Sequence, residues 1–330
     1  MSSQYPISTL NRIAQESLPR YDLSPRSTAT LINYTENATY RVDDPDSGER
    51  FIFRIYRLGY HDRPGIESEM QWMGALRRDA GVETPGVIPG KNGAPLQTLG
   101  DPPVPGPLFG AMFTFLTGSE PTEDNLPESF RRMGEVAGRM HRHSRTWVPP
   151  DDFRRPEWNF DTMLAGPRPV WGRWEEGVGL DSSSRLLLGR AVEVVSRRLG
   201  EFGRGKEHSG LVHADLRLAN LLFDGDRTKV IDFDDCGFGW YLYDLSTALT
   251  FIEERPDVPD LIRAWLEGYR RVMTMTGDEE REIPTFLMLR RMMVMSWIAS
   301  HADTELAQSE GVGYTLGTCR IAKRYLEGFS

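Results

Sequence analysis

The chain has 330 residues, of which 39% are hydrophobic and 26% charged. This composition is typical of a globular protein, and the length suffices for two lobes that each bury a core. The net charge of −9 argues against a non-specific nucleic-acid binder, which would more often be basic. Two cysteines, Cys236 and Cys319, are too few for a disulfide framework or for a zinc site built from cysteine alone, so we expect a reducing, cytoplasmic environment.

The sequence also argues against membrane insertion and secretion. The first fifteen residues have no apolar core followed by a small-residue cleavage site, so they do not predict a secretory signal. The longest apolar candidate, FLMLRRMMVMSWIA, is interrupted by Arg290 and Arg291 and is too short to cross a bilayer.

The first part of the chain is predicted to be rich in strands. β-Branched and aromatic residues predict strands over 27–34, 38–42 and 50–57, and the polar segment 43–49 predicts a hairpin turn. A helix should follow, because Ile66, Met70, Met73 and Leu76 recur at spacings of three and four, and Gly81 is a suitable end.

Segment 86–107, rich in glycine and proline, predicts loops and short strands, and the apolar run 108–116 ends at a turn over 117–121. From Pro127 onward the pattern becomes helical. Helices are expected over 127–144, 181–199, 240–254, 258–273, 283–302 and 314–329. We therefore predict an α+β fold with a β-rich lobe carrying one helix over 1–117 and a mostly helical lobe over 118–330.

Two neighbouring polar segments carry the chemistry. HADLRLANLL starts at His213, and KVIDFDD starts at Lys229, with a turn between two short apolar runs separating them. In a hairpin of this kind Asp215, Asn220 and Asp232 would converge at one end. An aspartate that accepts a hydroxyl proton, with an amide and a carboxylate oxygen for Mg²⁺, meets the needs of metal-assisted phosphoryl transfer.

The spacing H-x-D-L-x-x-x-N matches the catalytic loop of protein kinases, and D-F-D stands where kinases have D-F-G. The alternative is a polar loop between core strands, with His213 a buried and hydrogen-bonded histidine. The downstream Asp232 and the β-rich segment ahead favour the kinase interpretation.

LVHADLRLANLLFD with KVIDFDDCGFGWYLYDLS resembles the aminoglycoside phosphotransferase and choline kinase superfamily. FRIYRLGYH with IESEMQWMGAL is most similar to the branch of homoserine kinase type II and the bacterial stress-response Ser/Thr kinase. The resemblance implies a bilobal, protein-kinase-like fold with ATP bound between the lobes, and ATP and Mg²⁺ as cofactors. Ala214 departs from the glycine usual in this loop.

The resemblance also implies roles for single residues. Asp215 corresponds to the catalytic base, and Asn220 and Asp232 correspond to the Mg²⁺ ligands. His213 would hold the catalytic loop, and Asp244 would support it. Asp234 is a further candidate beside metal or substrate, with a solvated pair of Asp234 and Asp235 as the alternative.

In the first lobe, Arg54 stands where kinases place the phosphate-binding lysine, and Glu69 is the expected partner, with Glu67 as the alternative. Arg57 is expected on the opposite strand face. The phosphate loop lacks G-x-G-x-x-G. The nucleotide is expected to contact Asn37 and Thr39 in that loop and, at the hinge, the backbone of Phe113, Thr114, Phe115 and Leu116.

The acceptor pocket is expected in the helical lobe, where aromatic and acidic residues would suit a cationic group. The candidates are Trp158, Asn159, Trp240, Tyr243 and Glu253, and the alternative for the tryptophans is a core position. The predicted activity is ATP-dependent phosphorylation of a small-molecule hydroxyl of the amino alcohol, amino acid or antibiotic type. A Ser/Thr protein kinase and a nucleotide-binding pseudokinase scaffold are the alternatives, and no nucleic-acid or membrane partner is expected.

Overall fold

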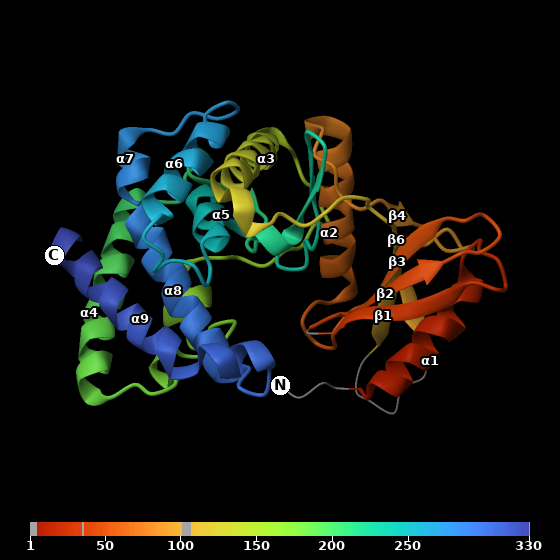
Figure 1. Cartoon of the computed structure of the whole chain (residues 1–330), viewed down its shortest axis with the longest axis horizontal. Helices are drawn as coiled ribbons and strands as arrows, with labels where there is room; N and C mark the ends of the chain where they lie inside the picture. The colour runs from red at the N-terminus through yellow and green to blue at the C-terminus, as the bar shows by residue number, and fades with distance from the viewer. Residues whose placement is uncertain (1–4, 35, 101–106, 330) are drawn as a thin grey trace. The chain divides into compact units, whose positions relative to one another are not determined.

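A computed structural model describes residues 5–34, 36–100 and 107–329. The chain divides into two compact units (Figure 1). Unit 1 comprises Met1–Gly118 with two later segments, Pro149–Arg155 and Lys229–Asp234. Unit 2 comprises Ser119–Val148, Pro156–Thr228 and Asp235–Ser330.

Unit 1 is built on a six-stranded sheet in the order β1-β2-β3-β6-β4, with β5 also pairing with β6. Its strands are β1 (Thr28–Tyr34), β2 (Ala38–Asp43), β3 (Arg50–Ile55), β4 (Val87–Ile88), β5 (Gln97–Leu99) and β6 (Leu108–Thr114). The predicted hairpin is present, because β2 and β3 pair antiparallel with Asp43 opposite Arg50. β3 ends at Ile55, two residues before the predicted end.

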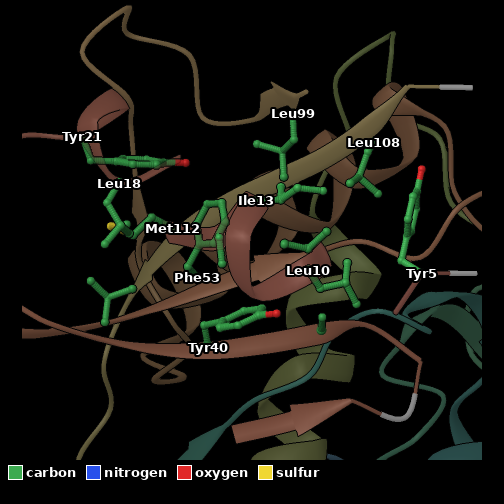
Figure 2. Packing of buried hydrophobic residues seen from close by; sticks show 14 residues of the cluster. Tyr5, Leu10, Ile13, Leu18, Tyr21, Tyr40, Phe53, Leu99, Leu108 and Met112 are labelled. Carbon is green, nitrogen blue, oxygen red and sulfur yellow. The ribbon is translucent and has the colours of Figure 1, made fainter. Parts of the chain in front are cut away.

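A helix that the sequence analysis did not predict covers this sheet. α1 (Ile7–Ser17) buries Leu10 and Ile13 against side chains from the strands, among them Phe53 and Met112 (Figure 2). A short 3₁₀ turn, Leu18–Arg20, follows it. Unit 1 therefore has one helix more than expected, and that helix completes its apolar core.

The predicted second helix is α2 (Arg63–Ala75), continued by a π turn over Leu76–Ala80. It begins at Asp62, whose side chain accepts a hydrogen bond from the Gly65 backbone N–H. It ends at Gly81, whose φ of 62° lies in the left-handed region that glycine tolerates. Within α2, Glu69 is buried, with 1% of its surface exposed.

Unit 2 is mainly helical (Figure 1). Its helices are α3 (Leu126–Thr146), α4 (Ser182–Phe202), α5 (Tyr241–Ala248), α6 (Val258–Tyr269), α7 (Gly277–Arg281), α8 (Ile283–Ser300) and α9 (Glu305–Phe329). The short α7 was not predicted, and α9 begins nine residues before the predicted start, with a kink at Gly311. Short 3₁₀ or π turns lie at Glu123–Asn125, Asp161–Ala165, Trp174–Glu176 and Leu218–Asn220.

Two glycines allow α3 and α6 to approach closely. A Cβ atom at Gly134 would overlap the carbonyl oxygen of Trp265, and one at Gly268 would overlap that of Arg131. The close pair of helices places His141 of α3 beside Tyr269 of α6, with 3.1 Å between His141 Nδ1 and the hydroxyl.

Two small sheets flank the catalytic-loop motif. β7 (Ser209–Val212) pairs antiparallel with β10 (Gly237–Trp240). β8 (Leu221–Asp224) pairs with β9 (Arg227–Val230), as the predicted hairpin requires. The segment from His213 to Asn220 thus runs between β7 and β8. Among the described residues, no helix is both long and apolar enough to cross a membrane.

Candidate active site

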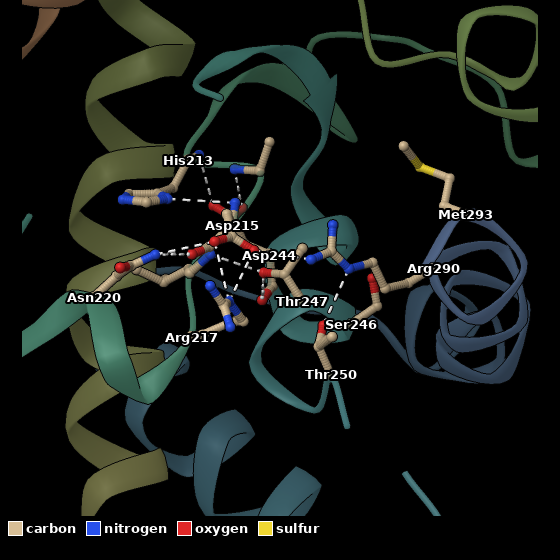
Figure 3. A network of polar contacts seen from close by, with 12 residues as sticks. His213, Asp215, Arg217, Asn220, Asp244, Ser246, Thr247, Thr250, Arg290 and Met293 are labelled. Carbon is tan, nitrogen blue, oxygen red and sulfur yellow. Dashed lines mark hydrogen bonds and ion pairs between the residues drawn. The ribbon is translucent and has the colours of Figure 1, made fainter. Parts of the chain in front are cut away.

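The loop after β7 is shaped by the buried carboxylate of Asp244. Its Oδ1 accepts a hydrogen bond from the Ala214 N–H at 2.8 Å, and its Oδ2 accepts one from the His213 N–H at 3.1 Å. Ala214 has a φ of 65°, a left-handed backbone that is uncommon for a residue with a Cβ. Asp244 therefore stabilises the sharp turn immediately before Asp215 (Figure 3).

His141 lies behind this turn and was not recognised in the sequence. Its Nε2 is 2.9 Å from Asp244 Oδ2, and both side chains are fully buried. His213 is also fully buried, and its Nδ1 accepts a hydrogen bond from the Asp215 N–H at 3.3 Å. Only the packing of α3 reveals the contribution of His141, because no motif marks it.

The Asp215 carboxylate is surrounded by donors (Figure 3). Arg217 Nε lies 3.1 and 3.0 Å from its two oxygens, Asn220 Nδ2 lies 3.1 Å from Oδ2, and Arg290 Nη2 lies 2.8 Å from Oδ1. Burial alone would raise the pKa of this carboxyl, but Arg217 and Arg290 outweigh burial and hold the pKa below its usual value. Asp215 is therefore ionised at neutral pH.

Asn220 faces Asp215 with its amide nitrogen, which also donates to the Asp215 carbonyl oxygen at 2.8 Å. This orientation leaves the amide oxygen of Asn220 as an acceptor. An amide oxygen is a suitable ligand for a hard divalent cation.

In unit 1, Arg54 lies between two carboxylates. Its Nη1 is 3.2 Å from Glu69 Oε1, and its Nη2 is 3.1 Å from Asp232 Oδ1. Burial raises the pKa of Glu69 to about 7 although Arg54 opposes the shift. The expected alternative, Glu67, instead pairs with Arg63 at 2.9 Å.

Asp232 is the accessible member of this group. Its side chain is 48% exposed, whereas that of Arg54 is 13% exposed. Its backbone φ of 63° again lies in the left-handed region. An exposed carboxylate in a constrained backbone fits a divalent-cation ligand, because it binds without burying an unpaired charge.

A second polar group in unit 1 surrounds Asp234. Arg57 Nη2 and His61 Nε2 each lie 3.7 Å from its carboxylate, and Arg155 donates to its carbonyl oxygen. The expectation that Arg57 faces away assumed a continuing strand and is wrong, because β3 ends at Ile55 and Arg57 lies beyond it. Asp234, 5% exposed, is not a solvated residue.

The remaining nucleotide candidates lie around the sheet of unit 1. The side-chain oxygen of Asn37 accepts a hydrogen bond from the Arg57 backbone at 2.9 Å, and Thr39 pairs with Arg54 across β2 and β3. Phe113 is buried. Thr114 donates its backbone N–H to the Gly86 carbonyl oxygen at 2.7 Å. Because β6 ends at Thr114, the backbone groups of Phe115 and Leu116 lie beyond the strand ladder.

The acceptor candidates in unit 2 make the contacts of packed residues. The indole N–H groups of Trp158 and Trp240 donate to the Asp235 and Gly203 carbonyl oxygens at 2.8 and 2.7 Å. Asn159 accepts a hydrogen bond from the Thr162 N–H at 3.0 Å, at the start of a π turn. The Tyr243 hydroxyl accepts from Arg290 at 3.0 Å, and Glu253 pairs with Arg291 at 2.7 Å.

The structure therefore shows two clusters of predicted site residues. Arg54, Glu69 and Asp232 are in contact in unit 1, and Asp215 and Asn220 are in contact in unit 2. Across the described ranges, no three histidine, cysteine, aspartate or glutamate side chains form a metal-binding group. A site with few protein ligands suits Mg²⁺, because this ion keeps waters and nucleotide phosphates among its ligands.

The sequence pattern of the phosphotransferase enzyme family (APH) matches residues 29–281. The chain belongs to this family. This APH chain is 38% identical to a solved microcompartment-associated aminopropanol kinase, with a TM-score of 0.88 and coverage of 97% of this chain and 99% of that one.

Curated relatives of this APH chain are more distant. The amicoumacin kinase of Bacillus subtilis (strain 168) is 24% identical over 86% of this chain and 83% of its own length. The homoserine kinase of Methylobacillus flagellatus is 25% identical over 70% of this chain and 67% of its own length. These relatives are named for small molecules. Their names agree with the predicted small-molecule kinase rather than with the protein-kinase or scaffold alternatives.

The predicted protein-kinase-like fold and the predicted kinase activity are thus confirmed. This APH chain is an ATP-dependent kinase that transfers a phosphoryl group to the hydroxyl of a small molecule. ATP and Mg²⁺ are the cofactors of this chemistry.

Proposed function

We propose that the acceptor is a short amino alcohol of the aminopropanol type. The observation that carries this proposal is the 38% identity to the aminopropanol kinase, which extends over 97% of this chain with a TM-score of 0.88. The amicoumacin and homoserine kinases are similar at only 24% and 25% identity.

Asp215 is the catalytic base in this proposal. Its carboxylate is ionised and held in place, so it can orient the acceptor hydroxyl and accept its proton as the phosphoryl group is transferred. Asp244 and His213 are positioning residues, because they fix the backbone turn on which Asp215 lies.

Arg54, supported by Glu69, binds the nucleotide phosphates in the same proposal, and Asp232 and Asn220 hold Mg²⁺. The guanidinium group of Arg54 is directed by Glu69, and Asp232 is exposed enough to exchange its contact with Arg54 for a cation. When bound, Mg²⁺ neutralises charge on the phosphates. Phe113, Thr114, Phe115 and Leu116 supply the backbone that contacts adenine, and Asn37 and Thr39 lie in the phosphate loop.

Charge around Asp215 constrains how an amino alcohol binds. Arg217 and Arg290 both contact this carboxylate, so two positive charges lie directly beside it. An ammonium group is repelled there, whereas a neutral hydroxyl is not. The acceptor therefore presents its hydroxyl end to Asp215 and its amino end elsewhere.

We also propose that residues 1–117 bind the nucleotide and that residues 118–330 carry out catalysis and bind the acceptor. A cytoplasmic location without nucleic-acid partners is part of the proposal as well. The net charge of −9 and the presence of only two cysteines in the sequence, Cys236 and Cys319, support these two points.

The test is a comparison of acceptors with the purified full chain. ADP release would be measured with Mg·ATP and aminopropanol, ethanolamine, choline, homoserine or amicoumacin, and phosphorylated product would be identified by mass spectrometry. We expect the highest kcat/KM for aminopropanol. A higher kcat/KM for homoserine or amicoumacin would contradict the amino-alcohol proposal and leave the kinase activity standing.

A further inference from the structure

α8 carries two adjacent buried arginines in an otherwise apolar helix. Arg290 and Arg291 are each 3% exposed, among buried methionine, leucine and valine side chains of the same helix. A buried charge is costly unless it is paired and hydrogen-bonded. Each guanidinium group must therefore meet a specific partner, and the two partners differ.

Arg290 has a partner for each of its guanidinium nitrogens. Nε donates to the Thr250 hydroxyl at 3.0 Å, Nη1 to the Tyr243 hydroxyl at 3.0 Å, and Nη2 to Asp215 Oδ1 at 2.8 Å. Figure 3 shows this side chain reaching from α8 to Thr250 and the catalytic loop. Thr250 and Tyr243 thereby hold the planar guanidinium group in place, and its third nitrogen is directed at Asp215.

The Tyr243 hydroxyl is well suited to hold this fork. Burial raises its pKa to about 12, so the hydroxyl stays protonated and neutral beside Arg290. It accepts from Arg290 and donates to the sulfur of Met293 at 3.2 Å. Tyr243, which was considered a substrate candidate, is thus engaged in holding Arg290.

Arg217 contacts the same carboxylate in a different way. It lies two residues after Asp215 on the loop itself, its side chain is 33% exposed, and its contact is made by Nε alone. The side chain of Arg290 is 4% exposed and comes from a core helix. Arg217 has room to move when an acceptor arrives, and Arg290 does not.

We propose that Arg290 is a positioning residue for phosphoryl transfer, which fixes the Asp215 carboxylate from the core through Oδ1. Arg217 is then the partner that adjusts when the acceptor hydroxyl approaches. This inference rests on the proposed role of Asp215 as the base. Under this inference Arg290 of α8 orients the catalytic carboxylate directly. The sequence of α8 shows only an interrupted apolar run and does not reveal this role.

The test uses Arg290→Met, Arg290→Lys and the matched control Arg291→Met, assayed with Mg·ATP and the best acceptor of the panel. Methionine keeps the length and apolar character that the helix requires. We expect Arg290→Met to lower kcat by about 10–100-fold, because a small misplacement of a reacting group has an effect of this size. The ATP dissociation constant and the acceptor KM should change by less than about threefold.

Arg290→Lys should recover part of kcat, since lysine keeps the charge but lacks the fork. Arg291 pairs with Glu253 and does not contact Asp215, so Arg291→Met should lower the melting temperature without a comparable loss of kcat. The double variant Asp215→Asn with Arg290→Met should have nearly the kcat of Asp215→Asn alone, because both changes remove one function.

Three results would overturn the inference. They are a near wild-type kcat in Arg290→Met, equal losses of kcat in Arg290→Met and Arg291→Met, and a loss confined to the ATP dissociation constant or acceptor KM. Near wild-type turnover in Asp215→Asn would instead remove the proposed function on which the inference rests, so the two failures are distinguishable.

Discussion

The side chain of His61 is 8% exposed, and its titration should be visible in the free energy of unfolding. Burial lowers its pKa to about 4, and repulsion from Arg155 adds to the shift although Asp234 opposes it. An unfolded histidine takes up its proton near pH 6.5. Between these two values the unfolded state binds the proton and the folded state does not, so stability falls as the pH is lowered.

We therefore expect His61→Gln to reduce the acid sensitivity of the fold. Glutamine retains an N–H donor for the Asp234 carbonyl oxygen, which His61 Nε2 contacts at 2.8 Å. Between about pH 7.5 and pH 4.5 the variant should lose about 2 kcal/mol less free energy of unfolding than the wild type, measured by urea unfolding. Identical pH dependence in the two proteins would show that folding does not lower the pKa of His61.

Arg54 should control nucleotide binding. Arg54→Met removes one charge-assisted contact to phosphate, so we expect about 10–100-fold weaker Mg·ATP binding by calorimetry, with Arg54→Lys intermediate. Arg54→Met also leaves Glu69 buried without its partner, and this can unfold unit 1.

The double variant Arg54→Met with Glu69→Gln separates weaker nucleotide binding from unfolding, since it also removes the unpaired buried carboxyl group of Glu69. If this double variant folds and binds Mg·ATP as tightly as the wild type, the phosphates are bound by another residue.

The sequence identified residues that belong to a motif and missed those that depend on packing. Asp215, Asn220 and Asp232 follow from motif spacing along the chain, and the resemblance to kinases implies the pairing of Arg54 with Glu69. His141 and Arg290 reach the catalytic loop from α3 and α8, and no local pattern shows which side chain a helix directs at a distant loop.

At the scale of single elements, the contact between α3 and α6 depends on glycine. A methyl group at Gly134 would overlap the Trp265 carbonyl oxygen, which belongs to the backbone and cannot rotate away. Gly134→Ala should lower the free energy of unfolding by about 2 kcal/mol or more, as overpacking of a helix interface does.

Gly200 of α4 is the matched control. A Cβ atom there meets nothing within 4 Å, so Gly200→Ala should instead stabilise the protein by up to about 1 kcal/mol through helix propensity. Thermal or urea unfolding of the two variants measures this contrast. Equal effects of the two substitutions would mean that α3 and α6 are farther apart than the structure indicates.

The sequence predicted those helices and strands whose hydrophobic periodicity is strong and whose ends carry a glycine or a polar turn. α2 was placed by its apolar spacing and by Gly81, and the hairpin of β2 and β3 by its polar turn. α1 was missed although Leu10, Ile13 and Ala14 lie on one face, because a single short amphipathic segment gains its stability from the sheet that it covers.

At the scale of the whole molecule, the Mg²⁺ dependence of the reaction rate tests Asp232 as a proposed metal ligand, because its side chain is 48% exposed. Asp232→Asn keeps the shape and tolerates the left-handed backbone but removes the charge. The Mg²⁺ concentration for half-maximal rate should rise by at least about tenfold. Asp151→Asn, an exposed site in unit 1, makes the same change of net charge and should leave the Mg²⁺ dependence unaltered.

A melting-temperature titration gives a second readout of the same ligand. Mg·ATP should stabilise the wild type and Asp151→Asn by mass action, and Asp232→Asn less at the same concentrations. If Asp232→Asn shows wild-type Mg²⁺ dependence in both assays, Asp232 is not a metal ligand.

The central claim is that the Asp215 carboxylate is the base for phosphoryl transfer to a small hydroxyl acceptor. The most direct measurement is kcat of Asp215→Asn with Mg·ATP and the best acceptor, beside the ATP dissociation constant of the same preparation. Asparagine keeps the shape and removes the proton acceptor, so we predict a loss of about 10²–10⁴-fold in kcat with ATP binding little changed. Phosphoryl transfer by Asp215→Asn at near the wild-type rate would contradict the account.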